Sequence, residues 1–148
     1  MKNKRNTLYL KFPNHPANIP VVRCAIKTFA EQANPTLETL NDILTALEEA
    51  VQNAITYAYI DPDVGQISVR AVLYDNNTLE ITVSDQGVGI SDIKKARSPL
   101  FTTRSKDHAG LGFTVMENFM DSVSVRSRPH CGRGTTVILK KTLEIRKV

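Results

Sequence analysis

Two alternating runs joined by a three-residue turn constrain the fold of this chain more than any other feature. Residues 66–74 and 78–84 place apolar side chains at every second position, the period of a strand with one buried face. Asp75, Asn76 and Asn77 lie between the runs, and asparagine tolerates the left-handed backbone of a tight turn. Because so short a turn joins only antiparallel neighbours, the sequence predicts a hairpin.

Periodicity also predicts the other elements. Three further runs are typical of strands, at residues 7–12, 122–128 and 135–140. Three helices are predicted, at residues 16–33, 36–58 (with Thr36 as N-cap) and 113–120. The order of strand, two helices, hairpin, long loop, helix and hairpin predicts a two-layer α/β sandwich. In this fold, helices cover one face of a mixed, mostly antiparallel sheet.

Length and composition limit the class of protein. The 148 residues fit one domain covering 1–148, and 41% hydrophobic with 23% charged residues is ordinary for a globular chain. No apolar stretch is long enough for a membrane span, and none follows the basic N-terminus as a signal peptide would require, so we expect a cytoplasmic protein. The net charge is +4, but the cations are scattered, so direct DNA binding is not expected.

The helix predicted over 36–58 carries a polar pair opposite its apolar stripe, which consists of Leu40, Leu44, Leu47, Val51 and Ile55. Glu49 and Asn53 lie at about 160° and about 200° from Val51, whereas Glu48 lies on the shoulder of the stripe. A proton-accepting carboxylate beside an amide oxygen that ligates Mg²⁺ would be functional, although many surface helices have a solvated polar face of this kind. A ligand could approach the backbone closely because the flanks are small, at Ala46, Ala50 and Ala54.

Two glycine signatures follow the predicted hairpin. Asp85 ends a strand, where it could accept a hydrogen bond from an exocyclic amine, and Gly87 and Gly89 would let the backbone approach a flat ring. Gly110 and Gly112 precede a predicted helix, whose exposed N–H groups could hold phosphate. A polar loop as long as the one between the signatures is usually a functional lid or disordered, and its cations suit a polyphosphate.

These motifs occur in a recognisable series. In order they are Glu49xxxAsn53, Asp85xGly87xGly89, Gly110xGly112 and Gly134-Thr135. The series resembles the N, G1, G2 and G3 boxes of the GHKL ATPases, which include gyrase, Hsp90, histidine kinases and MutL. Residues 96–103 and 112–121 narrow the resemblance to the sporulation anti-sigma F factors, a family of serine-protein kinases. The similarity covers nearly the whole chain and implies the GHKL (Bergerat) type of sandwich.

The resemblance implies a role for each motif residue. Glu49 would be the general base and Asn53 the Mg²⁺ ligand, while Asp85 would bind the adenine amine together with Thr135, directly or through water. The rest of the ATP site would consist of Gly87, Gly89, Thr102, Thr103, Arg104, His108, Gly110, Leu111, Gly112 and Phe113.

The same resemblance implies partners and an activity. The chain would act as a homodimer, inhibit a sporulation sigma factor of RNA polymerase, and use ATP and Mg²⁺ to phosphorylate a serine of an anti-anti-sigma protein. A related general-stress anti-sigma kinase and an ATP-switched sigma-binding module with little transfer remain as alternatives. A detached ATPase or histidine-kinase-like domain fits less well, because the chain shows no phosphoacceptor helix pair and no transducer domain.

The chain departs from the family pattern at two places. Tyr57-Ala58 stand where the family has His-Gly, and His108 stands near the arginine of a slightly longer lid. Because histidine is largely neutral at pH 7, Arg104 or Lys106 could supply the phosphate contact instead. We expect residues 94–109 to be mobile without nucleotide and ordered with Mg·ATP, since little apolar surface would hold them closed.

Overall fold

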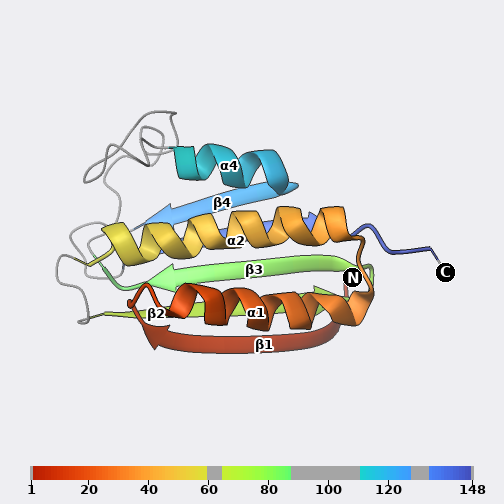
Figure 1. Ribbon diagram of the computed structural model, residues 1–148, viewed down its shortest axis with the longest axis horizontal. Coiled ribbons are helices and arrows are strands. Elements are labelled where there is room, and N and C mark those ends of the chain that lie inside the picture. The colour runs from red at the N-terminus through yellow and green to blue at the C-terminus, as the bar shows by residue number, and fades with distance from the viewer. Residues whose placement is uncertain (1, 60–64, 88–110, 128–133, 148) are drawn as a thin grey trace.

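The computed structural model describes residues 2–59, 65–87, 111–127 and 134–147. In these segments the elements are β1 (Lys4–Pro13), α1 (Asn18–Ala30), the short 3-10 helix η1 (Glu31–Ala33), α2 (Leu37–Tyr57), β2 (Gln66–Tyr74), β3 (Thr78–Asp85), α4 (Leu111–Phe119), β4 (Ser122–Ser127) and β5 (Thr135–Thr142). The helices lie on one face of a sheet, with α2 between α1 and α4 (Figure 1). The predicted two-layer α/β sandwich is confirmed.

The sheet has the strand order β1-β2-β3-β5-β4, and each neighbouring pair is antiparallel. The predicted hairpin is β2–β3, in which Ile67 lies opposite Asp85 and Leu73 opposite Leu79. At its turn Asn77 takes a left-handed φ of 64°, as the turn chemistry indicated. Strand β3 is therefore the centre of the sheet, and its last residue is Asp85.

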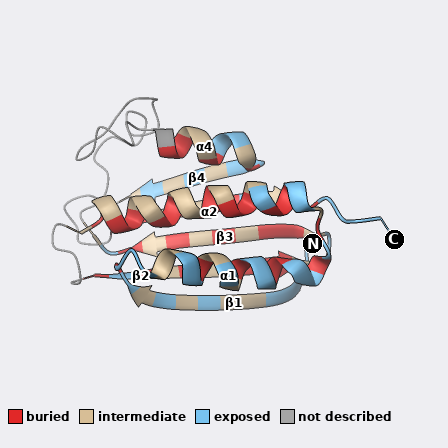
Figure 2. Ribbon diagram, in the orientation of Figure 1, coloured by how far each residue is buried: buried red, intermediate tan, exposed pale blue. Residues whose placement is uncertain are grey.

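The core lies between the helices and the sheet. All five residues of the predicted stripe on α2 are buried, and Figure 2 shows burial concentrated in α2 and the central strands, while the edge strands β1 and β4 are half-buried or exposed. The opposite sheet face is not covered by any helix in the described segments. Tyr9 lies on that face, 70% exposed, with the guanidinium of Arg70 5.7 Å from its ring centroid.

Some element boundaries follow from the local sequence, whereas strand pairing sets others. Thr36 is the N-cap of α2, and its hydroxyl accepts a hydrogen bond from the Thr39 N–H at 3.3 Å, as predicted. The first helix is shorter than predicted, since α1 gives way to η1 before Asn34 turns left-handed. Strands β1 and β5 are longer than predicted because β1 pairs with β2 from Lys4 to Pro13, with one register shift, and β5 pairs with β3 from Thr136 to Thr142.

None of the described helices has both the length and the apolar character needed to cross a membrane.

Candidate functional site

Four elements meet at one end of the sandwich, where α2 and β3 end and where α4 and β5 begin (Figure 1). This arrangement gathers residues that are far apart in the chain: Glu49 and Asn53 on α2, Asp85, Gly112 and Thr135. The first and fourth motifs, and the described parts of the second and third, therefore lie at the same end of the molecule.

One carboxylate oxygen of Asp85 is hydrogen-bonded by the backbone, and the other accepts no hydrogen bond from the described residues. Asp85 is only 8% exposed, and its Oδ1 accepts hydrogen bonds from the N–H groups of Gly87 at 2.9 Å and Thr135 at 3.2 Å. Within the described segments Oδ2 accepts none. Burial raises the pKa of the Asp85 carboxyl, although the two backbone hydrogen bonds act in the opposite direction. The carboxylate is thus oriented, with Oδ2 available to a hydrogen-bond donor of a ligand.

Two glycines allow the backbone to approach Asp85 closely. Gly134 has a left-handed φ of 63°, and a Cβ there would collide with the Asp85 backbone oxygen and Oδ1. A Cβ on Gly87 would collide with the carbonyl of Ala58, just past the end of α2. The sequence predicts that Gly87 lets the backbone approach a ligand ring. The structure gives a second reason for glycine here, because any side chain would collide with the Ala58 carbonyl.

Thr135 connects Asp85 to the edge strand β4. It is 9% exposed, its N–H is the second donor to Asp85, and its hydroxyl is 3.0 Å from the Ser127 hydroxyl. Ser127 also donates to the Gly134 carbonyl at 3.2 Å. Sequence reasoning missed Ser127, although it lies directly opposite Thr135 in the β4–β5 hairpin. Pairing the two strands in that register would have found it.

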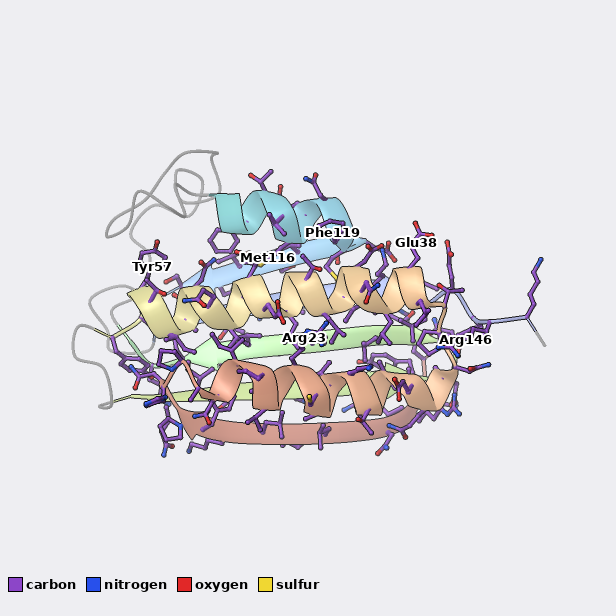
Figure 3. The ribbon with its side chains drawn as sticks, in the orientation of Figure 1. Arg23, Glu38, Tyr57, Met116, Phe119 and Arg146 are labelled. Carbon is purple, nitrogen blue, oxygen red and sulfur yellow. The ribbon has the colours of Figure 1, made fainter. Side chains whose placement is uncertain are left out.

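The two adjacent glutamates of α2 lie beside different helices, Glu48 beside α1 and Glu49 beside α4. Glu48 pairs with Arg23 of α1, with Oε1 and Nε 2.7 Å apart, and Figure 3 shows Arg23 in the space between the two helices. Glu49 instead lies on the side of α4. A Cβ on Gly112 would be 2.8 Å from Asn53 Nδ2 and 3.3 Å from Glu49 Oε2. Glu49 and Asn53 therefore form one half-buried polar pair beside the first turn of α4.

The small flank of α2 serves a purpose that we did not predict. Ala46, Ala50 and Ala54 are buried, and α4 packs closely along α2. Met116 of α4 is fully buried and faces α2 (Figure 3). The alanines therefore help a helix to approach, whereas we had expected them to admit a ligand. The consequence is that α4 brings Gly112 to the polar pair.

The pair could hold a hard cation. Its donors are an amide oxygen and a carboxylate, the oxygen ligands that Mg²⁺ prefers. In the described part of the chain no three His, Cys, Asp or Glu side chains form a metal-binding group. This donor set fits Mg²⁺ better than a metal ion whose ligands all come from the protein, because Mg²⁺ takes few protein ligands when substrate phosphates provide the others.

The remaining predicted site residues divide into two groups. Leu111 begins α4, and the Phe113 side chain is buried in the core, so an ATP contact of Phe113 would come from its backbone. The other group lies outside the described residues, as does the predicted lid at 94–109: Gly89, Thr102, Thr103, Arg104, His108 and Gly110.

Comparison with known proteins agrees with this geometry. Residues 12–141 match the histidine kinase-like ATPase domain family. An anti-sigma F factor of Pasteuria penetrans is 43% identical over 142 residues, covering 95% of this chain and 93% of the relative. One of Caldanaerobacter subterraneus is 45% identical over 137 residues, covering 92% and 93%.

The fold is shared with a solved structure of the RsbU and RsbW domains of a Mycobacterium tuberculosis protein. The TM-score is 0.68 at 18% identity, over 97% of this chain and 34% of that one. That likeness shows the fold alone, whereas the two curated relatives match over nearly their whole lengths. The chain therefore belongs to the anti-sigma F factor family, within the histidine kinase-like ATPase domains.

Proposed function

We propose that this protein is an ATP-dependent protein-serine kinase that also binds and inhibits a sporulation sigma factor. Its substrate would be a serine of an anti-anti-sigma protein, and it would act as a homodimer in the cytoplasm. Family membership supports a sigma-binding protein with a nucleotide-binding fold. The observation that carries the kinase assignment is Glu49, a carboxylate next to Asn53 with no partner among the described residues.

The adenine would be recognised at Asp85. The base would approach the end of β3, where Oδ2 accepts a hydrogen bond from its exocyclic amine. An ionised Asp85 would make a stronger hydrogen bond to this amine than a neutral acceptor would. Guanine presents a carbonyl at the matching position, so the carboxylate would repel it.

Transfer would take place at the polar pair. Glu49 would accept the proton of the substrate serine as its hydroxyl oxygen bonds to the γ-phosphorus and the bond from that phosphorus to the bridging oxygen of ADP breaks. The Asn53 amide oxygen would hold Mg²⁺, which when bound neutralises charge on the phosphates. The first N–H groups of α4 lie beside the pair and would orient the phosphates.

The test is incubation with γ-labelled ATP and candidate anti-anti-sigma proteins, with sigma binding measured in parallel by co-elution. We expect label on one serine of one candidate and sigma co-elution that is stronger with ATP than with ADP. Sigma binding without any transfer would instead support the ATP-switched binding module. Absence of ATP binding would reject both functions.

A further inference from the structure

A tyrosine outside all four motifs joins three segments at the adenine end of the site. The Tyr59 hydroxyl donates a hydrogen bond to the carbonyl of Gln66, at the start of β2, at 2.7 Å. It also accepts one from the N–H of Gln86, just after β3, at 2.9 Å. Its ring covers Gly65, where a Cβ would overlap the ring atoms. One side chain therefore holds the end of α2 against both strands of the central hairpin.

These contacts lead directly to the adenine carboxylate. Gln86 follows Asp85 in the chain, and the next residue, Gly87, donates its N–H to Asp85 Oδ1. Gly87 in turn rests against the carbonyl of Ala58, the residue before Tyr59. The 86–87 backbone is thus bonded to the Tyr59 hydroxyl at Gln86 and packed against Ala58 at Gly87. The orientation of the Asp85 carboxylate depends on where this backbone lies.

We propose that the Tyr59 hydroxyl is a positioning group for adenine recognition. By holding the Gln86 amide it keeps the Gly87 N–H on Oδ1, which leaves Oδ2 of Asp85 aimed at the adenine amine. Tyr59 does not touch the nucleotide itself in this arrangement. The proposal rests on the proposed function, in which Asp85 binds adenine, and adds the residue that sets the geometry of that contact.

The proposal predicts a loss confined to base recognition. Removing the hydroxyl leaves the Gln86 N–H without its acceptor, and the 86–87 backbone then keeps only the hydrogen bond from the Gly87 N–H to Asp85 Oδ1 and its packing against Ala58. The polar pair at Glu49 and Asn53 lies beside the first turn of α4, so we expect its position to be unaffected by the loss of the Tyr59 hydroxyl. ATP binding should weaken, while binding through the phosphates and transfer at saturating ATP should be retained.

The experiment compares Tyr59→Phe with the wild type for ATP and GTP affinity by calorimetry. We expect ATP affinity to fall about tenfold, because the Gln86 hydrogen bond is lost and Asp85 Oδ2 is no longer held toward the adenine amine. GTP affinity should change less than about twofold. The phosphotransfer kcat should be unchanged while KM for ATP rises. Tyr9→Phe is the matched control, since it removes the same atom from an exposed ring on the uncovered sheet face.

Two further measurements keep the test decisive. Gly65→Ala retains the hydroxyl but displaces the ring, so it should reproduce the loss of ATP over GTP preference. In the wild type the Gln86 amide should exchange slowly with solvent, and exchange at the rate of a free amide would overturn the proposal. Equal losses for ATP and GTP, or wild-type ATP affinity in both variants, would also overturn it. A wild type that binds no ATP would reject the proposed function itself.

Discussion

The two ends of the candidate site are built in different ways. At the end proposed to bind adenine, which we call the adenine end, the Asp85 carboxylate is buried, accepts two backbone hydrogen bonds and lies against Gly87 and Gly134. At the end of the polar pair, Glu49 and Asn53 are half-buried, and their side chains make no hydrogen bond or ion pair with the described residues. The first end is complete before a ligand arrives, and the second offers charge and amide groups that a ligand would satisfy.

The difference agrees with the proposed role of each end. Discrimination between bases needs an acceptor held in one orientation, because a mobile acceptor adapts to the wrong base. Proton transfer and cation binding need groups whose interactions strengthen as charge develops, and prior partners would weaken them. The comparison therefore predicts that changes at the adenine end alter affinity and selectivity, whereas changes at the polar pair alter the rate.

The largest effect is expected from Glu49→Gln. Loss of the general base should lower phosphotransfer by roughly 100- to 10,000-fold, with ATP affinity nearly unchanged. The measurement is the rate of label transfer at saturating ATP and substrate protein, beside calorimetry for ATP. Glu48→Gln is the matched control, because its carboxylate is paired with Arg23 on the other side of α2. If Glu48→Gln loses transfer and Glu49→Gln does not, the base has been assigned to the wrong glutamate.

Asp85→Asn should weaken ATP binding by about 10- to 100-fold and reduce the preference for ATP over GTP, because a hydrogen bond to a charged group is lost. The amide oxygen can still accept from Gly87 and Thr135, so the local backbone should persist. Titration calorimetry with both nucleotides measures the effect.

Asp121→Asn supplies the control for Asp85→Asn, since Asp121 Oδ2 also accepts a backbone N–H, that of Thr142. Asp121 precedes the start of β4, whereas the site lies where β4 ends, opposite Thr135. Unchanged ATP affinity in Asp85→Asn would mean that adenine is recognised elsewhere.

Gly112→Ala should lower the transfer rate about tenfold with little change in ATP affinity. The added Cβ would lie 2.8 Å from Asn53 Nδ2 and 3.2 Å from its Oδ1, so the amide must shift by a few tenths of an ångström. A misplacement of about 1 Å can cost about 100-fold in rate, and this one is smaller. The same change favours helix formation by about 1 kcal/mol, so urea unfolding should show no loss of stability. Wild-type transfer in this variant would mean that the position of Asn53 is not critical.

The smallest effect concerns stability and pH. Burial raises the pKa of Asp85 in the folded chain above its value in the unfolded chain, so the folded state binds more protons between the two values. Stability contributed by this group therefore falls as pH rises through that interval and stays lower at neutral pH. Asp85→Asn should accordingly be at least as stable as the wild type at about pH 7, and its advantage should shrink below about pH 4.

Urea unfolding at the two pH values tests this last prediction. A variant that is less stable than the wild type at neutral pH would contradict it, because ionised Asp85 would then stabilise the fold.

Local patterns determined the architecture and much of the candidate site. Alternation in 66–74 and 78–84 predicted the central hairpin, and the stripe from Leu40 to Ile55 predicted the buried face of α2. The alignment of Glu49 with Asn53 also followed from helix geometry alone, since residues four apart lie on one face whatever the rest of the chain does. Each of these features depends only on the backbone period within one element.

Only the tertiary structure decided what each face meets. It placed α1 beside Glu48 and α4 beside Glu49, filled the alanine flank with a helix, and set Gly87 against Ala58. It also connected Tyr59 with Gln86, 27 positions later in the chain. Such contacts depend on the order β1-β2-β3-β5-β4 and on the packing of helices across it. No local period encodes them, because the same amphipathic helix would bury its stripe equally well beside either neighbour.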